Sequence, residues 1–173
     1  SAPNANATLW NYTVGPEVYS SPAMADGRVL IGSYDDRVYA LNATTGVHLW
    51  NYITGGPIIR SSPAVAEGKV YIGSGDCRVY ALNATTGVQL WNYTTSGDLW
   101  SSPVVVNGKV YIGSCDNRVY ALNASTGAQL WNYTTGNAIY SSPAVVDDKV
   151  YIGSHDGEVY ALNSTDGKVV WNY

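Results

Sequence analysis

The sequence predicts an all-β fold built from repeated antiparallel units, and three features support this prediction. Tryptophans recur at separations of 40, 41, 40 and 40 residues, each in a Leu-Trp-Asn-Tyr or Val-Trp-Asn-Tyr tetrad. Between them the chain repeats, with small changes, the phrases Val-Tyr-Ile-Gly-Ser and Val-Tyr-Ala-Leu-Asn, in which β-branched and aromatic residues favour strands. The spacing of apolar residues typical of a helix is absent. Self-similarity at this period is typical of a propeller or solenoid, whose repeats need neighbours to bury a core.

Residues 100–135 illustrate how one repeat is expected to fold. The pair Asn107-Gly108 is a strong hairpin signal, and Gly127 can take the positive φ that a later turn needs. The expected strands are residues 100–106, 109–114, 118–123 and 128–134. Four short antiparallel strands in about 40 residues make one propeller blade.

Applied to the whole chain, this pattern gives a single domain, residues 1–173, with four four-stranded antiparallel blades. The expected blades are residues 17–54, 58–95, 98–135 and 138–173. One extra N-terminal outer strand, residues 8–13, precedes blade 1 and has no blade of its own.

The run from Val119 to Trp131 resembles the tryptophan-docking motif of the pyrroloquinoline-quinone-type β-propeller repeat family, and the resemblance covers nearly the whole chain. It implies that a glycine and a tryptophan lock each blade to the next. The docking residues implied are Trp10, Trp50, Trp91, Trp131 and Trp171 with Gly46, Gly87, Gly127 and Gly167. The family usually has Asp where this chain has Asn42, Asn83, Asn123 and Asn163. Its rings close with about eight blades, so these four form half of an eight-bladed ring or an open arc.

An unclosed arc leaves one face of blade 1 and one face of blade 4 bare. Two copies can then complete one ring, or a head-to-tail contact can repeat as a filament. We expect the strand Thr8–Thr13 to lie on a sheet edge of another subunit, as in β-strand addition. The alternative is that this segment is the remnant of a lost blade.

Composition points to an extracellular or cell-surface protein. The net charge of −4, with nine scattered basic residues, excludes nucleic acid as an expected partner. No apolar run reaches the roughly 18–20 residues of a transmembrane segment. The chain starts at Ser1 and its one methionine is Met24, which favours removal of a secretory signal. Glycosylation triplets, Asn-x-Ser/Thr, agree with secretion unless duplication copied an accidental one. They begin at Asn6, Asn11, Asn42, Asn83, Asn92, Asn123, Asn132 and Asn163.

The residues that could carry chemistry are few. Cys77 and Cys115 lie in corresponding turns of adjacent repeats, and an even pair in a secreted chain predicts a disulfide, with two reduced thiols as the alternative. His48 and His155 occupy non-equivalent positions, so no metal site is expected. No nucleophile motif is present, and the acidic pairs at 35–36 and 147–148 fall in turns. We therefore expect no enzyme activity and no cofactor.

The loop that enters each first strand varies most among the repeats, which makes it a candidate for specificity. Its last residue is Tyr19, Arg60, Trp100 or Tyr140 in the four repeats. These side chains are a possible binding rim near the central funnel; the alternative is packing around it.

The sequence leaves three hypotheses for function, in this order. The first is a non-enzymatic, secreted, glycosylated propeller-repeat protein that self-assembles as a filament or cell-surface structural subunit. The second is an eight-bladed dimeric ring that binds other surface proteins or glycans at its funnel. The third is a relative of the quinoprotein dehydrogenases, which the resemblance to the repeat family keeps open.

Overall fold

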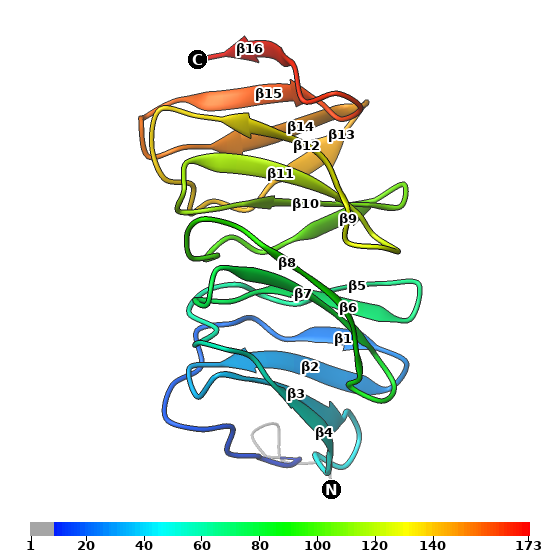
Figure 1. The fold of residues 1–173 in the computed structure, drawn as a ribbon. Helices are drawn as coiled ribbons and strands as arrows, with labels where there is room; N and C mark the ends of the chain where they lie inside the picture. The colour runs from blue at the N-terminus through cyan, green and yellow to red at the C-terminus, as the bar shows by residue number, and fades with distance from the viewer. Residues whose placement is uncertain (1–8) are drawn as a thin grey trace, which may run out of the picture.

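A computed structural model describes residues 9–173, which form four sheets of four antiparallel strands and no helix (Figure 1). This confirms the all-β fold of four-stranded blades. In each sheet the strands lie in chain order, from the first strand to the outer fourth strand. Blade 1 holds β1 (Ala23–Ala25), β2 (Arg28–Ser33), β3 (Arg37–Asn42) and β4 (His48–Ile53), and blade 2 holds β5 (Ala64–Ala66), β6 (Lys69–Gly73), β7 (Arg78–Asn83) and β8 (Gln89–Thr94). Blade 3 holds β9 (Val104–Val106), β10 (Lys109–Gly113), β11 (Arg118–Asn123) and β12 (Gln129–Thr134), and blade 4 holds β13 (Ala144–Val146), β14 (Lys149–Gly153), β15 (Val159–Asn163) and β16 (Val169–Asn172).

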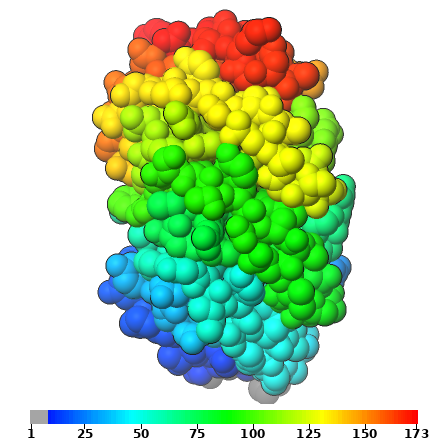
Figure 2. Space-filling model, viewed as in Figure 1, coloured from blue at the N-terminus to red at the C-terminus, as the bar shows by residue number. Residues whose placement is uncertain are grey.

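The blades stack one on the next in chain order, so blades 1 and 4 form opposite ends of an open arc (Figures 1 and 2). The first strands β1, β5, β9 and β13 contact one another in sequence, which places them together along one side of the stack. β9 is shorter than the predicted strand 100–106: it begins at Val104, after Pro103, whose nitrogen cannot donate to a ladder. No described helix exists that could cross a membrane.

Local sequence accounts for the turns. The hairpin between β9 and β10 turns at Asn107 and Gly108, with φ of 50° and 69°, as an Asn-Gly turn with two positive φ values requires. Blade 4 makes the same turn with Asp147 and Asp148, both also at positive φ. Between the third and fourth strands, the Asn42 side-chain oxygen accepts the amides of Thr44 and Thr45, each at 2.9 Å. Asparagine in place of the family's aspartate therefore still supports this turn.

The extra N-terminal strand is absent: residues 9–13 belong to no strand, and Thr8 lies outside the described residues. A strand needs a neighbouring strand to bond with, and the sheet of blade 1 is complete with its own β4 on the outside. The segment lies instead against its own blade 1, where the indole nitrogen Nε1 of Trp10 donates a hydrogen bond to the carbonyl oxygen of Ala43 at 3.0 Å. In the single chain the segment therefore rests on its own blade, and its pairing with another subunit stays a prediction.

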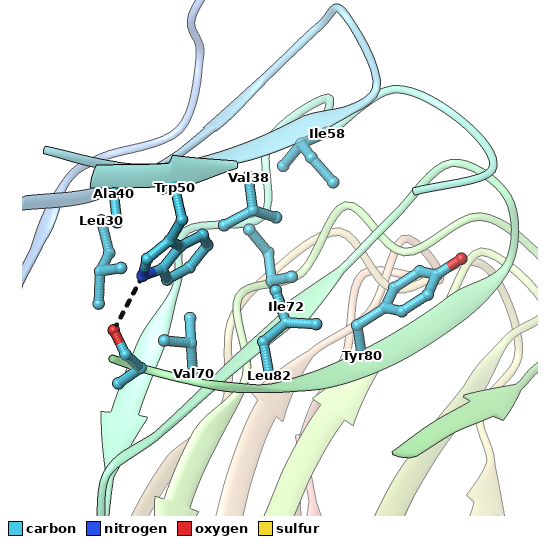
Figure 3. Packing of buried hydrophobic residues seen from close by; sticks show 10 residues of the cluster. Leu30, Val38, Ala40, Trp50, Ile58, Val70, Ile72, Tyr80 and Leu82 are labelled. Carbon is cyan, nitrogen blue, oxygen red and sulfur yellow. Dashed lines mark hydrogen bonds between the residues drawn. The ribbon is translucent and has the colours of Figure 1, made fainter. Parts of the chain in front are cut away.

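The core lies between the blades. At the first interface, Trp50 of β4 packs with Leu30 of its own blade and with Val70 and Leu82 of blade 2, and its indole reaches a carbonyl oxygen of blade 2 (Figure 3). Similar clusters of mostly equivalent residues fill the second and third interfaces around Trp91 and Trp131. Because these clusters combine two blades each, every blade depends on its neighbour for burial.

Replacing Trp91 by Ala should cost about 3–5 kcal/mol of unfolding free energy, because it empties a core site between blades 2 and 3. Denaturant melts measure this loss. Leu90→Ala, at a neighbouring side chain that is 45% exposed, is the matched control and should change stability little. A loss under about 1 kcal/mol for Trp91→Ala would show that the indole is no anchor.

A buried hydroxyl links each third strand to its preceding turn. The hydroxyl of Tyr120 donates to Asp116 Oδ2 at 2.6 Å, and Tyr80 makes the same bond to Asp76. Burial, and then the hydrogen bond to the Asp76 carboxylate, raises the pKa of Tyr80 to about 12. A tyrosine titrates near 10 when unfolded, so the stability that this raised pKa provides is complete below pH 10 and disappears as pH rises through about 12.

The unfolding free energy should therefore fall between pH 10 and 12, which thermal melts across this range would measure. Tyr80→Phe keeps the ring and removes the titrating group, so its decline over the same range should be shallower. An equally steep decline in both proteins would exclude this tyrosine as a source of the alkaline sensitivity.

Candidate functional site

The three interior blade interfaces share one docking contact. Each indole donates from Nε1 to a carbonyl oxygen of the next blade: Trp50 to Ala84 at 3.2 Å, Trp91 to Ala124 at 3.0 Å and Trp131 to Ser164 at 3.1 Å. Each ring also lies against a glycine, and a methyl group added to Gly87 would come within 2.6 Å of the Trp50 ring. Only glycine fits, both for space and because Gly87 has a φ of 72°. The structure therefore brings together the glycines and tryptophans that the family resemblance implies.

A second contact places an apolar side chain of each blade over a glycine of the blade before it. A methyl group added at these glycines would lie 2.2–2.6 Å from the covering side chain. The pairs are Ile58 over Gly32, Leu99 over Gly73 and Ile139 over Gly113.

A third contact runs through all four blades, and we call it the serine ladder. The amide of one serine donates to the hydroxyl of the corresponding serine in the next blade. The bonds join Ser21 N to Ser62 Oγ at 2.8 Å, Ser62 N to Ser102 Oγ at 2.9 Å and Ser102 N to Ser142 Oγ at 3.0 Å. Each contact is asymmetric in the same way at every interface: a blade supplies the indole, the covered glycine and the serine amide, and its successor supplies the carbonyl, the covering side chain and the serine hydroxyl.

Blade 4 presents the donor half of this interface uncovered. Trp171 is 44% exposed, whereas the three interior docking tryptophans are 7–8% exposed. Val159 is also 44% exposed, although the matching valines Val38, Val79 and Val119 are fully buried. Among the described residues, no apolar side chain covers Gly153, and Ser142 has no fifth serine for its amide.

Blade 1 presents the acceptor half. Val18 matches the covering residue Ile58. The residues just before them, Glu17 and Pro57, accept hydrogen bonds from the equivalent turn amides of Tyr34 and Gly75, at 3.0 and 2.9 Å. Val18 is 41% exposed and Ile58 is buried, and Ser21 is the open start of the serine ladder. The remaining part is a pocket for an indole, formed by Gly46 and the carbonyl of Ala43, which we call the Trp slot. Trp10 of the same chain fills it.

The predicted binding rim is partly assembled. The Arg60 guanidinium lies 5.5 Å from the centre of the Trp100 ring, and Trp100 stacks on Tyr140 at 4.8 Å. The Tyr19 ring instead contacts the Tyr34 ring, with 6.4 Å between the ring centres. These two rings line a hollow of about 370 Å³ together with Arg60 and Trp100. The Trp100 indole nitrogen is buried and has no hydrogen-bond partner within residues 9–173.

Sequence reasoning missed two neighbours of the rim. Tyr34 lines the hollow, and His155 meets the edge of the Tyr140 ring at 4.6 Å. Both residues directly follow the Gly-Ser dipeptide that recurs at the end of the second strand in every repeat. The same position holds Gly75 and Cys115 in the other repeats, and this variation was the available signal.

The predicted disulfide is wrong: Cys77 and Cys115 are free thiols. Cys77 is the last residue of its turn and Cys115 the first of the corresponding turn, so the two are offset. Asp98 contacts both, with its Oδ1 3.6 Å from Cys77 Sγ and its carbonyl oxygen accepting the Cys115 amide at 2.9 Å. Burial raises the pKa of the Cys115 thiol to about 11. Both cysteines are half-buried and have raised thiol pKa values, which does not favour a role as nucleophiles.

The described glycosylation triplets fall into two groups. The outer asparagines Asn11, Asn92 and Asn132 are exposed. The turn asparagines are half-buried, and each uses its side-chain oxygen to bond turn amides. They are Asn42, Asn83, Asn123 and Asn163, while Asn6 lies outside the described residues. Within residues 9–173 no group of three or more His, Cys, Asp or Glu side chains could hold a metal ion.

Comparison with known proteins agrees with this geometry. The chain resembles BamB from Moraxella catarrhalis, with a TM-score of 0.79 and 23% identity over 92% of this chain and 53% of that one. It also resembles a quinohemoprotein alcohol dehydrogenase from Pseudomonas putida HK5, with a TM-score of 0.78 and 24% identity over 91% and 34%. The computationally designed Ika8 protein matches with a TM-score of 0.78 and 19% identity over 88% and 48%. The chain thus spans about half or less of these structures, and no curated protein sequence matches it.

A family model described as outer membrane protein assembly factor BamB matches residues 2–62 and 54–173. With the β-propeller blades and their tryptophan–glycine docking, this match shows that the chain belongs to the BamB-like family of pyrroloquinoline-quinone-type propeller repeats.

Proposed function

We propose that the chain is a non-enzymatic, extracellular, N-glycosylated propeller-repeat protein that self-assembles through its bare blade faces, as a subunit of a filament or cell-surface structure. One observation carries the proposal: the exposed faces of blades 4 and 1 are the two halves of an interface that the chain already makes three times. A second copy supplies the missing half in each case.

Complementarity of the two faces favours a second copy as the occupant. Val18 of one copy matches the uncovered Gly153 of another, and the Ser142 amide matches the Ser21 hydroxyl. Each face fits the other and not itself, so the contact is head-to-tail. The head-to-tail contact gives a closed ring if the blades of two copies complete a full circle, and an open filament if they do not. Burying a large apolar side chain contributes about 1.5–3 kcal/mol, so Trp171 and Val159 together provide a substantial driving force.

The non-enzymatic part of the proposal rests on where the acidic residues lie. Asp147 and Asp148 form a hairpin turn, and Asp35 bonds the hydroxyl of Tyr39 at 2.5 Å. The exposed outer asparagines support glycosylation and, with it, an extracellular location.

Native protein should elute in size-exclusion chromatography above the 18.5 kDa of the polypeptide. Light scattering combined with absorbance and refractive index separates peptide mass from glycan mass, so one experiment tests both parts. We expect at least two polypeptides per particle, each with attached carbohydrate. A stable particle of 18.5 kDa without carbohydrate contradicts self-assembly and glycosylation alike.

A second candidate function is binding of another surface protein or a glycan at the rim. The hollow of about 370 Å³ beside Arg60 and Trp100, with an unpaired indole nitrogen, is the observation that favours it. Aromatic faces pack well against sugar rings and extended peptides. The matching family model is described as outer membrane protein assembly factor BamB, which agrees with a role in protein contacts.

A glycan array probed with the protein should show retention that Trp100→Ala lowers at least tenfold, because the main aromatic face is lost. Val88→Ala, at an exposed residue of the turn before β8, is the control and should keep retention unchanged. Equal retention by the two variants would exclude the rim as the glycan site.

A further inference from the structure

Trp10 reproduces the interior docking contact in detail. Its indole nitrogen lies 3.0 Å from the carbonyl oxygen of Ala43, the same distance as for Trp91 and Ala124. A methyl group added to Gly46 would lie 2.6 Å from the Trp10 ring, as it does for the Gly87 and Trp50 pair. The Trp slot of blade 1 is therefore occupied in the free chain.

Tyr12 extends the imitation by one contact. In the interior interfaces, the outer-strand tyrosine meets the third-strand tyrosine of the next blade, as Tyr52 meets Tyr80 at 5.6 Å and 57°. Tyr12 meets Tyr39 of blade 1 at 6.3 Å and 59°. The segment Trp10-Asn11-Tyr12 thus stands where the outer strand of a preceding blade would stand.

The segment that contains Trp10 is not part of a sheet, unlike the outer strands at the interior interfaces. Residues 9–13 form no strand, Trp10 is half-buried, and Tyr12 is 40% exposed. At the second and third interior interfaces the same carbonyl oxygen accepts two donors. Ala124 accepts the Trp91 indole and the Tyr71 hydroxyl, both at 3.0 Å, and Ser164 accepts the matching pair from blade 3. Trp10 brings only one of these donors to Ala43.

Blade 4 carries the complete version of the same element. The sequence Trp171-Asn172-Tyr173 repeats Trp10-Asn11-Tyr12. Trp171 already lies 5.8 Å from Tyr151 at 48°, which matches Trp91 and Tyr71 at 5.8 Å and 48°. Docked on a second copy, Trp171 and Tyr151 would offer Ala43 both donors. Trp10 has the advantage of being tethered in the same chain, which raises its effective concentration.

We propose that Trp10 is a removable internal cap, and that assembly exchanges it for Trp171 of a second copy in the Trp slot of blade 1. This inference rests on the proposed self-assembly and adds its regulation, because the N-terminal segment competes with the partner for one site. Removing the cap strengthens association, and removing Trp171 weakens it.

Sedimentation equilibrium of the full chain measures the association constant. Trp10→Ala should strengthen association at least tenfold, and Trp171→Ala should weaken it at least tenfold. Leu9→Ala, next to the cap and 93% exposed, is the matched control and should leave the constant unchanged. Circular dichroism melts show which variants remain folded.

The outcomes separate the inference from the function on which it rests. If the wild-type chain and Trp10→Ala both stay monomeric, self-assembly itself is wrong. If all variants associate as the wild type does, self-assembly stands and the exchange is overturned.

Cross-linking tests the same contact without removing an indole. With Cys77 and Cys115 changed to Ser, the changes Ser21→Cys and Ser142→Cys place thiols at the two open ends of the serine ladder. Oxidation should link separate copies, and faster when Trp10→Ala is added. Ser102→Cys with Ser142→Cys is the positive control, since within one chain the Ser102 amide nitrogen already lies 3.0 Å from Ser142 Oγ. Intermolecular linking that the added Trp10→Ala leaves unchanged overturns the exchange.

Discussion

The hydrogen bond from a tryptophan indole to a carbonyl of the next blade, made across a glycine, is the contact on which the structure depends. Each four-stranded sheet buries its faces only against neighbouring sheets, and this contact fixes how far apart and in which direction they stack. Neither partner can change alone: a side chain at Gly87 would enter the Trp50 ring, and a smaller residue at Trp50 would leave a void. The tryptophans recur about every 40 residues because each blade needs one to dock on the next.

Structural features that recur in every repeat could be predicted from the sequence. Features that depend on the exact place of one residue could not. The tryptophan and glycine positions could be read from their spacing, and the structure brings them together. The strand predicted at residues 8–13 was wrong. The Trp10 tetrad is sufficient for the indole contact with blade 1, but a strand also needs a neighbouring strand for its backbone hydrogen bonds. The disulfide failed because Cys77 and Cys115 occupy different places in corresponding turns. For the rim, variable positions identified Arg60 and Trp100, whereas Tyr34 was missed on the neighbouring turn.

The three interior interfaces are equivalent and asymmetric, so the two exposed ends of the arc are complementary to each other. The exposed face of blade 4 carries the hydrogen-bond donors, the Trp171 indole and the Ser142 amide. The outer face of blade 1 carries the acceptors, the Ala43 carbonyl and the Ser21 hydroxyl. The same polarity explains why the chain can partly satisfy one end by itself: a short copy of the outer-strand tetrad suffices for the Trp slot. It cannot cover blade 4, whose exposed Val159 needs the face of a whole blade.

An electron cryomicroscopy reconstruction of the native assembly tests the central claim most directly. The account predicts that Trp171 of one copy lies over Gly46 of the next, with its indole nitrogen at the Ala43 carbonyl oxygen and Trp10 displaced. An assembly in which Trp10 keeps the slot and blade 4 stays uncovered, or whose contacts lie elsewhere, would contradict it.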